Sequence, residues 1–287
     1  MDASQRLNVS AGIASVTTAL FLVALKAWAV AATGALSVAA SLADSLLDLL
    51  ASSAGLAGIL YAAKPPDEDH SFGHTSAEDL VALGQALLVA ASAGLIGWQA
   101  MHRLVQPRAL ESEGLGLAVM AVATAVTLCL VLWQDRVARR TGSRIVAADR
   151  LHYLADLIPN IGAIVALLAF SRFGIGWVDP AVALVACLVL LFGARRIGFG
   201  AWNSLMDRAA DPALLAEVGR IVSEYPGVLG YHDLKTRTAG SRVFVQVHLE
   251  LDGAQTLRSA HGIAAGVRRA LLDALPNADV IIHQDPA

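Results

Sequence analysis

The sequence has little charge and almost no cysteine for its length. Charged residues make up 16% of the 287 positions, whereas a soluble protein carries about 25%. Hydrophobic residues make up 56%, and the mean hydropathy is +0.60. The two cysteines, Cys129 and Cys187, lie far apart within apolar stretches, so neither a disulfide framework nor a thiolate metal site is expected. A net charge of −3 gives no basis for nucleic-acid binding.

The apolar residues are concentrated in long stretches before residue 200. A membrane-spanning helix needs about 20 mostly apolar residues. The predicted spanning helices are residues 9–32, 35–62, 79–100, 114–134, 145–170 and 178–200. The first residues lack the basic region and cleavage site of a signal peptide, so we expect the first stretch to be retained. Residues 1–207 are therefore predicted to form a six-helix transmembrane bundle.

Basic residues in short loops predict the orientation of this bundle. The loop between the fourth and fifth predicted helices contains Arg136, Arg139, Arg140 and Arg144. Such loops remain on the cytoplasmic side of the membrane. Both termini are then expected in the cytoplasm, in a multi-pass membrane protein.

Residues 208–287 have the pattern of a small cytoplasmic domain. We expect helices at 212–225 and 257–275, and strands at 228–238, 242–251 and 278–283. In the second strand, apolar residues at 243, 245, 247 and 249 alternate with Phe244, Gln246, His248 and Glu250. This period of two is typical of a half-buried strand. The order predicts an α+β domain with an open-faced sheet.

Four ionisable residues lie within predicted membrane helices. Asp44 and Asp48 are four residues apart, as are His152 and Asp156, so each pair shares one helix face. A rise of about 1.5 Å per residue puts both pairs at matching depths. The four side chains can therefore form one cluster, provided that the second and fifth helices are neighbours. Such residues at mid-bilayer are costly and mark function.

One imidazole and three carboxylates suit a tetrahedral Zn²⁺ site. The absence of thiolates argues against Cu(I), while Fe²⁺, Cd²⁺, Co²⁺ and Mn²⁺ remain open. A hydrogen-bond network without an ion is the alternative, although clustered carboxylates repel one another. Lys26, in the first predicted helix, is expected to snorkel or to pair with an acid.

Four motifs together resemble the cation diffusion facilitator family, and most closely its bacterial zinc/iron-efflux branch of YiiP-like exporters. They are DSLLD at 44–48, HSFGH at 70–74, HYLAD at 152–156 and MDR at 206–208. The resemblance extends over nearly the whole chain. It implies a homodimeric metal/proton antiporter that uses the four residues above as its transport site. It also implies a tail with a ferredoxin-like, metallochaperone-like fold.

The resemblance implies two further metal sites and one interface residue. The loop site consists of Asp67, His70 and His74. The cytoplasmic-domain site consists of His232, His248, His261, His283 and Asp285. Asp207 is expected at the dimer interface, where relatives often pair it with a lysine at the position of Ser76.

We therefore expect a Zn²⁺/H⁺ antiporter that exports metal by alternating access, with Zn²⁺ as substrate and as a structural or regulatory ion. Protons, the lipid bilayer and a second copy of the chain are its expected partners. An Fe²⁺, Cd²⁺ or Mn²⁺ exporter of the same fold is the alternative, and a metal sensor without transport is a weaker one. A passive channel would show no proton dependence. An enzyme is not expected, because no HExxH motif occurs and the quartet leaves no open metal position.

Overall fold

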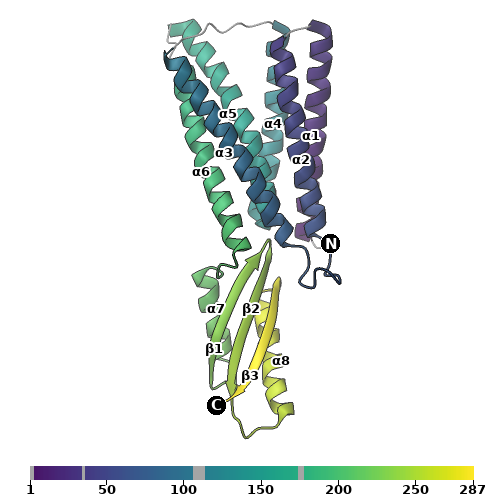
Figure 1. The fold of residues 1–287 in the computed structure, drawn as a ribbon, viewed down its shortest axis with the longest axis vertical. Coiled ribbons are helices and arrows are strands. Elements are labelled where there is room, and N and C mark those ends of the chain that lie inside the picture. The colour runs from purple at the N-terminus through teal and green to yellow at the C-terminus, as the bar shows by residue number, and fades with distance from the viewer. Residues whose placement is uncertain (1–2, 34–35, 106–113, 174–177) are drawn as a thin grey trace. The chain divides into compact units, whose positions relative to one another are not determined.

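The computed structural model describes residues 3–33, 36–105, 114–173 and 178–287. The chain divides into two compact units, Met1–Ala201 and Trp202–Ala287, and each is described by itself. The first contains most of six long helices, and the second contains two shorter helices and a small sheet (Figure 1). The long helices are α1 (Ala3–Thr33), α2 (Leu36–Ala62), α3 (Ser76–Val105), α4 (Gly114–Thr141), α5 (Arg144–Phe173) and α6 (Val178–Leu205).

The helices lie in the predicted order, and several are longer than their apolar stretches. Helix α4, for example, continues beyond its apolar stretch to Thr141, and the added residues are mostly polar. Five helices in the described part of the chain are long and apolar enough to cross a membrane: α1, α2, α3, α4 and α6. In the remaining long helix, α5, the charged residues Arg144, Asp149, Arg150 and Asp156 all lie in the first half.

Helix α5 has the central place in the first unit. It contacts α1, α2, α3 and α4. Its residues Leu151 and Ala155 also join a buried cluster with Val89 of α3 and with Cys187 and Leu190 of α6. The contact between α2 and α5 meets the condition under which the four ionisable membrane residues could come together.

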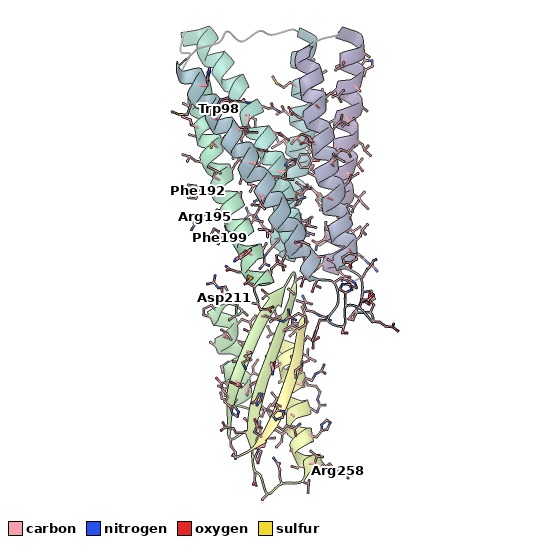
Figure 2. The ribbon with its side chains drawn as sticks, in the orientation of Figure 1. Trp98, Phe192, Arg195, Phe199, Asp211 and Arg258 are labelled. Carbon is pink, nitrogen blue, oxygen red and sulfur yellow. The ribbon has the colours of Figure 1, made fainter. Side chains whose placement is uncertain are left out.

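Large apolar side chains cover much of the outer surface of the long helices. Trp98 of α3 and Phe192 and Phe199 of α6 are 67%, 69% and 57% exposed. Figure 2 shows them projecting outward from these helices. The guanidinium group of Arg195 lies 5.2 Å from the centroid of the Phe199 ring. Exposed apolar surface of this extent suits contact with lipid rather than water.

The second unit is a three-stranded sheet with two helices, α7 (Pro212–Ser223) and α8 (Leu257–Ala274). Its strands are β1 (Gly230–Ala239), β2 (Arg242–Leu251) and β3 (Ala278–Pro286), in the order β1-β2-β3. Strand β2 pairs antiparallel with β1 and parallel with β3. Val245, Val247 and Leu249 are buried against both helices, as the period-two pattern predicted. The opposite sheet face is left for polar side chains.

Gly193 permits close packing between α6 and α5. A Cβ atom added there would lie 2.7 Å from Cδ1 and 2.8 Å from Cδ2 of Leu151. We predict that Gly193→Ala lowers the free energy of unfolding by about 1–3 kcal/mol, since overpacking strains a well-packed core. Denaturant unfolding of the detergent-solubilised protein would measure the change.

Gly94 of α3 supplies the matched control, because an added Cβ there has no atom within 4 Å. Gly94→Ala is expected to be neutral or to stabilise the helix by about 0.5–1 kcal/mol. Equal unfolding free energies for the two variants would contradict the proposed contact.

Candidate metal centres

The first centre lies between α2 and α5. His152 Nε2 lies 3.0 Å from Asp48 Oδ1. Ligand atoms of Asp48, His152 and Asp156 lie within 4.8 Å of one another. Asp48 is only 8% exposed. An imidazole nitrogen and carboxylate oxygens at this spacing can converge on one divalent cation.

Asp44 lies one helical turn before Asp48 on α2, and it is exposed. It is not part of the three-residue group. The structure therefore brings together three of the four predicted residues. The fourth lies on the same helix, displaced along its axis by one turn.

A cluster of hydroxyl groups adjoins this centre, and sequence reasoning missed it. Ser52 Oγ lies 2.9 Å from Tyr153 Oη. Ser15 Oγ donates to Ser52 Oγ at 2.9 Å, and Tyr153 Oη donates to the carbonyl oxygen of Ser15 at 3.2 Å. All three residues are at most 1% exposed. The available signal was spacing: Ser52 follows Asp48 by four residues, and Tyr153 follows His152 directly.

Lys26 of α1 makes hydrogen bonds to α2 rather than a direct ion pair in the described part of the chain. Its Nζ donates to Ser45 Oγ at 2.7 Å and to the carbonyl oxygen of Ser41 at 3.1 Å. Its positive charge acts on Asp48, Asp156 and Asp44 from this position. The ammonium group therefore offsets part of the negative charge of these three carboxylates.

The second centre is in the loop between α2 and α3. His74 Nε2 lies 3.2 Å from Asp67 Oδ2, and His70 Nδ1 lies 3.4 Å from Asp67 Oδ1. The two imidazole centroids are 4.5 Å apart. His74 is buried, and no described group forms a hydrogen bond with its Nδ1. The structure thus brings together all three residues predicted for the loop site.

Hydrogen bonding prepares Asp67 to act as a ligand. The backbone N–H of His70 donates to Asp67 Oδ1 at 2.7 Å, and this bond lowers the pKa of the carboxyl group. The nearby imidazoles of His74 and His70 lower it further. Asp67 therefore remains a carboxylate well into the acid range. Tyr61, which the sequence did not indicate, packs its ring edge-on against His74 with centroids 4.7 Å apart.

The third centre follows from the register of the sheet. His232 of β1 is opposite His248 of β2, which in turn is opposite His283 of β3. Opposed residues point to the same face of a sheet, so the three imidazoles form a row. The ring centroids are 5.1 Å apart for His232 and His248, and 4.6 Å apart for His248 and His283.

Asp285 lies among the three histidines of the row. Its Oδ2 is 2.9 Å from His248 Nδ1 and 3.3 Å from His232 Nε2, and its Oδ1 is 3.1 Å from His283 Nε2. The hydrogen bond with His248 is the main cause that lowers the pKa of Asp285. A carboxylate with both oxygens directed at imidazoles can bridge two cations.

Two predicted residues lie apart from this row, and one unpredicted residue adjoins it. His261 is exposed on α8, outside the group. Asp207 has a positive φ of 53° and accepts a hydrogen bond from Arg237 Nη1 at 3.2 Å. Glu250 Oε1 lies 2.8 Å from His232 Nδ1. Its place beside His248 on the polar face of β2 could have identified it.

These observations define a multi-pass membrane protein with three groups of metal-ligating side chains. Residues 12–206 match the family described as the cation efflux transmembrane domain, and residues 210–287 match the cation efflux protein cytoplasmic domain. The chain belongs to the cation efflux family, that of the cation diffusion facilitators, whose members are transporters rather than enzymes.

Curated relatives match over almost the whole chain. The cation-efflux pump FieF of Serratia proteamaculans strain 568 is 42% identical over 281 residues, which cover 98% of this chain and 93% of that protein. FieF of Klebsiella pneumoniae is 40% identical over 282 residues, covering 98% and 94%. Among solved structures, the Zn form of the candidate zinc transporter CzrB is 33% identical. The match covers 28% of this chain and 92% of the CzrB chain, with a TM-score of 0.27.

Glu250 is expected to orient the imidazole of His232 for metal binding. Loss of a residue that hydrogen-bonds to a metal ligand typically weakens metal affinity by about 10–100-fold. We predict that Glu250→Gln weakens Zn²⁺ binding by the tail within that range. The measurement is a competitive titration against a chelating indicator, using full-length protein that also carries Asp48→Ala and His70→Ala.

Glu217 of α7 provides the matched control, since it is an exposed glutamate that pairs with Arg220. Glu217→Gln should leave the affinity unchanged. If Glu250→Gln behaved like the control, Glu250 would have no part in the tail site.

Proposed function

We propose that this chain exports a divalent metal ion, principally Zn²⁺, from the cytoplasm in exchange for protons. The observation that carries the proposal is the group formed by Asp48, His152 and Asp156 between two helices of the membrane unit. Asp44 completes the transport site as the fourth ligand when the helices rearrange. The cation efflux family and the FieF relatives support export of a divalent cation.

The donor atoms favour Zn²⁺ as the substrate. A tetrahedral set of one imidazole and three carboxylates suits this ion, and the described groups contain no thiolate that would select Cu(I). Carboxylates close together in a low-dielectric region repel one another unless a cation or protons neutralise them. The site is therefore occupied alternately by metal and by protons.

Competition for the same ligands couples metal to protons. Metal ions bind carboxylates and imidazoles only in their deprotonated form. Each proton that moves down one pH unit supplies about 1.4 kcal/mol. Returning two protons for each Zn²⁺ is electroneutral. Any other ratio moves net charge, which the membrane potential drives or opposes by about 2.3 kcal/mol per charge per 100 mV. Rocking of helices against one another exposes the site alternately to each side.

The proposal includes a topology and a homodimer. Six helices cross a bacterial inner membrane with both termini in the cytoplasm, and the domain boundary falls at 207/208. The tail adopts a ferredoxin-like, metallochaperone-like fold, and two copies associate with Asp207 at their interface. Metal bound at the loop site and at the tail histidines, including His261, regulates the dimer.

An exporter of Fe²⁺, Cd²⁺ or Mn²⁺ is the second candidate. The observation that favours it is the carboxylate content of the membrane group, because oxygen ligands accept these ions as well. A sensor without transport is a weaker candidate, since it would need the exposed tail site but not the buried one.

The test is Zn²⁺ flux into proteoliposomes with and without a pH gradient. We expect gradient-dependent flux in the wild type and its loss, to below about a tenth, in Asp48→Ala, because removal of a ligand weakens metal binding by at least that factor. A series of Zn²⁺, Fe²⁺, Cd²⁺ and Mn²⁺ on the same vesicles then decides the substrate.

Asp135→Ala is the matched control. Asp135 is also an aspartate of the membrane unit, but it pairs with Arg139 and Arg150 rather than with a histidine. It should retain gradient-dependent flux. If flux depended neither on the pH gradient nor on Asp48→Ala, the membrane group would be ruled out as the transport site.

A further inference from the structure

A second buried carboxyl group lies one turn before His152 on α5. Asp149 is 4% exposed, and Gln134 of α4 beside it is fully buried. Gln134 Nε2 donates to Asp149 Oδ2 at 2.6 Å. The two residues line a narrow cavity with Gly12 of α1 and Gly55 of α2. Neither belongs to the group of Asp48, His152 and Asp156.

Each of the two side chains has an oxygen atom without a donor. Asp149 Oδ1 and Gln134 Oε1 are both buried, and no group in the described part of the chain donates a hydrogen bond to either. The cavity between the helices leaves no room for a water molecule. An ionised carboxylate in this position would therefore be desolvated, unpaired and only half hydrogen-bonded, which is strongly unfavourable.

A proton on Asp149 removes these conflicts. The neutral acid carries no buried charge, and its O–H supplies a donor for the otherwise unpaired amide oxygen of Gln134. A carboxylic acid and a primary amide are complementary, since the amide N–H donates to one acid oxygen while the acid O–H can donate to the amide oxygen. We infer that Asp149 is a proton-binding site, distinct from the metal cluster, that holds its proton against Gln134.

The surroundings of Asp149 contain few charges that could oppose this state. The other residues that line the cavity from α1, α2, α4 and α5 do not titrate. Helices α1 and α2 place the hydroxyls of Ser15 and Ser52 beside the carboxyl group. Helix α3 contributes nothing to the lining. The adjacent Arg150 forms its ion pair with Asp135 of α4.

His152 and Tyr153 are the titratable neighbours on α5 itself, and Asp48 of α2 acts on Tyr153. Metal that arrives at Asp48 and His152 brings positive charge within one turn of Asp149, and a nearby cation favours the carboxylate. This step rests on the proposed function. The O–H bond of Asp149 then breaks, both electrons stay on Oδ1, and the proton passes to water through the hydroxyls of Ser15, Ser52 and Tyr153.

Infrared difference spectroscopy on the metal-free, full-length protein at neutral pH tests the bound proton. Asp149→Asn keeps the shape and the hydrogen bond but cannot ionise. We expect the wild type to show a carboxylic-acid carbonyl band that Asp149→Asn lacks. Asp149→Glu should shift the band rather than remove it, and this variant decides the assignment if Asp149→Asn fails to fold. The control Asp135→Asn, at an arginine-paired carboxylate, should leave the band unchanged.

Proton release on Zn²⁺ binding in weakly buffered solution tests the coupling. Asp149→Asn should release about one proton fewer for each Zn²⁺ bound than the wild type, and Asp135→Asn should match the wild type. An unchanged infrared band in both Asp149→Asn and Asp149→Glu would overturn the proton site. A missing band with unchanged release would overturn the coupling. The infrared result does not depend on transport, so it stands even if wild-type flux proves indifferent to a pH gradient.

Discussion

The contact between Asp48 of α2 and His152 of α5 is the constraint on which the membrane unit depends. The two side chains lie 3.0 Å apart, and a second polar contact between these helices joins Ser52 to Tyr153. In a low-dielectric region, a charged or polar group without a partner is costly. The rotation of α5 about its axis is therefore fixed by the need to direct His152 and Asp156 toward α2.

Other polar residues of α5 also form ion pairs or hydrogen bonds with neighbouring helices. Arg144 forms an ion pair with Asp79 of α3, and Arg150 forms one with Asp135 of α4. Tyr153 forms hydrogen bonds with α1 and α2 through Ser15 and Ser52. These partners come from four different helices, so the polar residues of α5 also specify its neighbours.

Helix order and the i, i+4 pairs could be predicted from the sequence, because hydropathy and helical periodicity are local properties. Partners on other helices could not, because they depend on which helices meet and at what height. Asp44 illustrates the limit: it shares a helix face with Asp48, but in the structure it is exposed and is not part of the group. In the tail, alternation identified the polar face of β2, whereas the row of three histidines required the strand register.

Carboxyl groups in this chain differ in what neutralises them, and this difference separates their roles. Asp67 and Asp285 are partly exposed and accept hydrogen bonds from neighbouring groups, which lower the pKa of each. They are thus ready to bind metal without first losing a proton. Asp48 is buried but faces an imidazole, so metal or a proton can take the same place. Asp149 is buried beside a neutral amide and two neutral hydroxyl groups, and it has no place for metal. The smallest cation, a proton, is the one that fits this site.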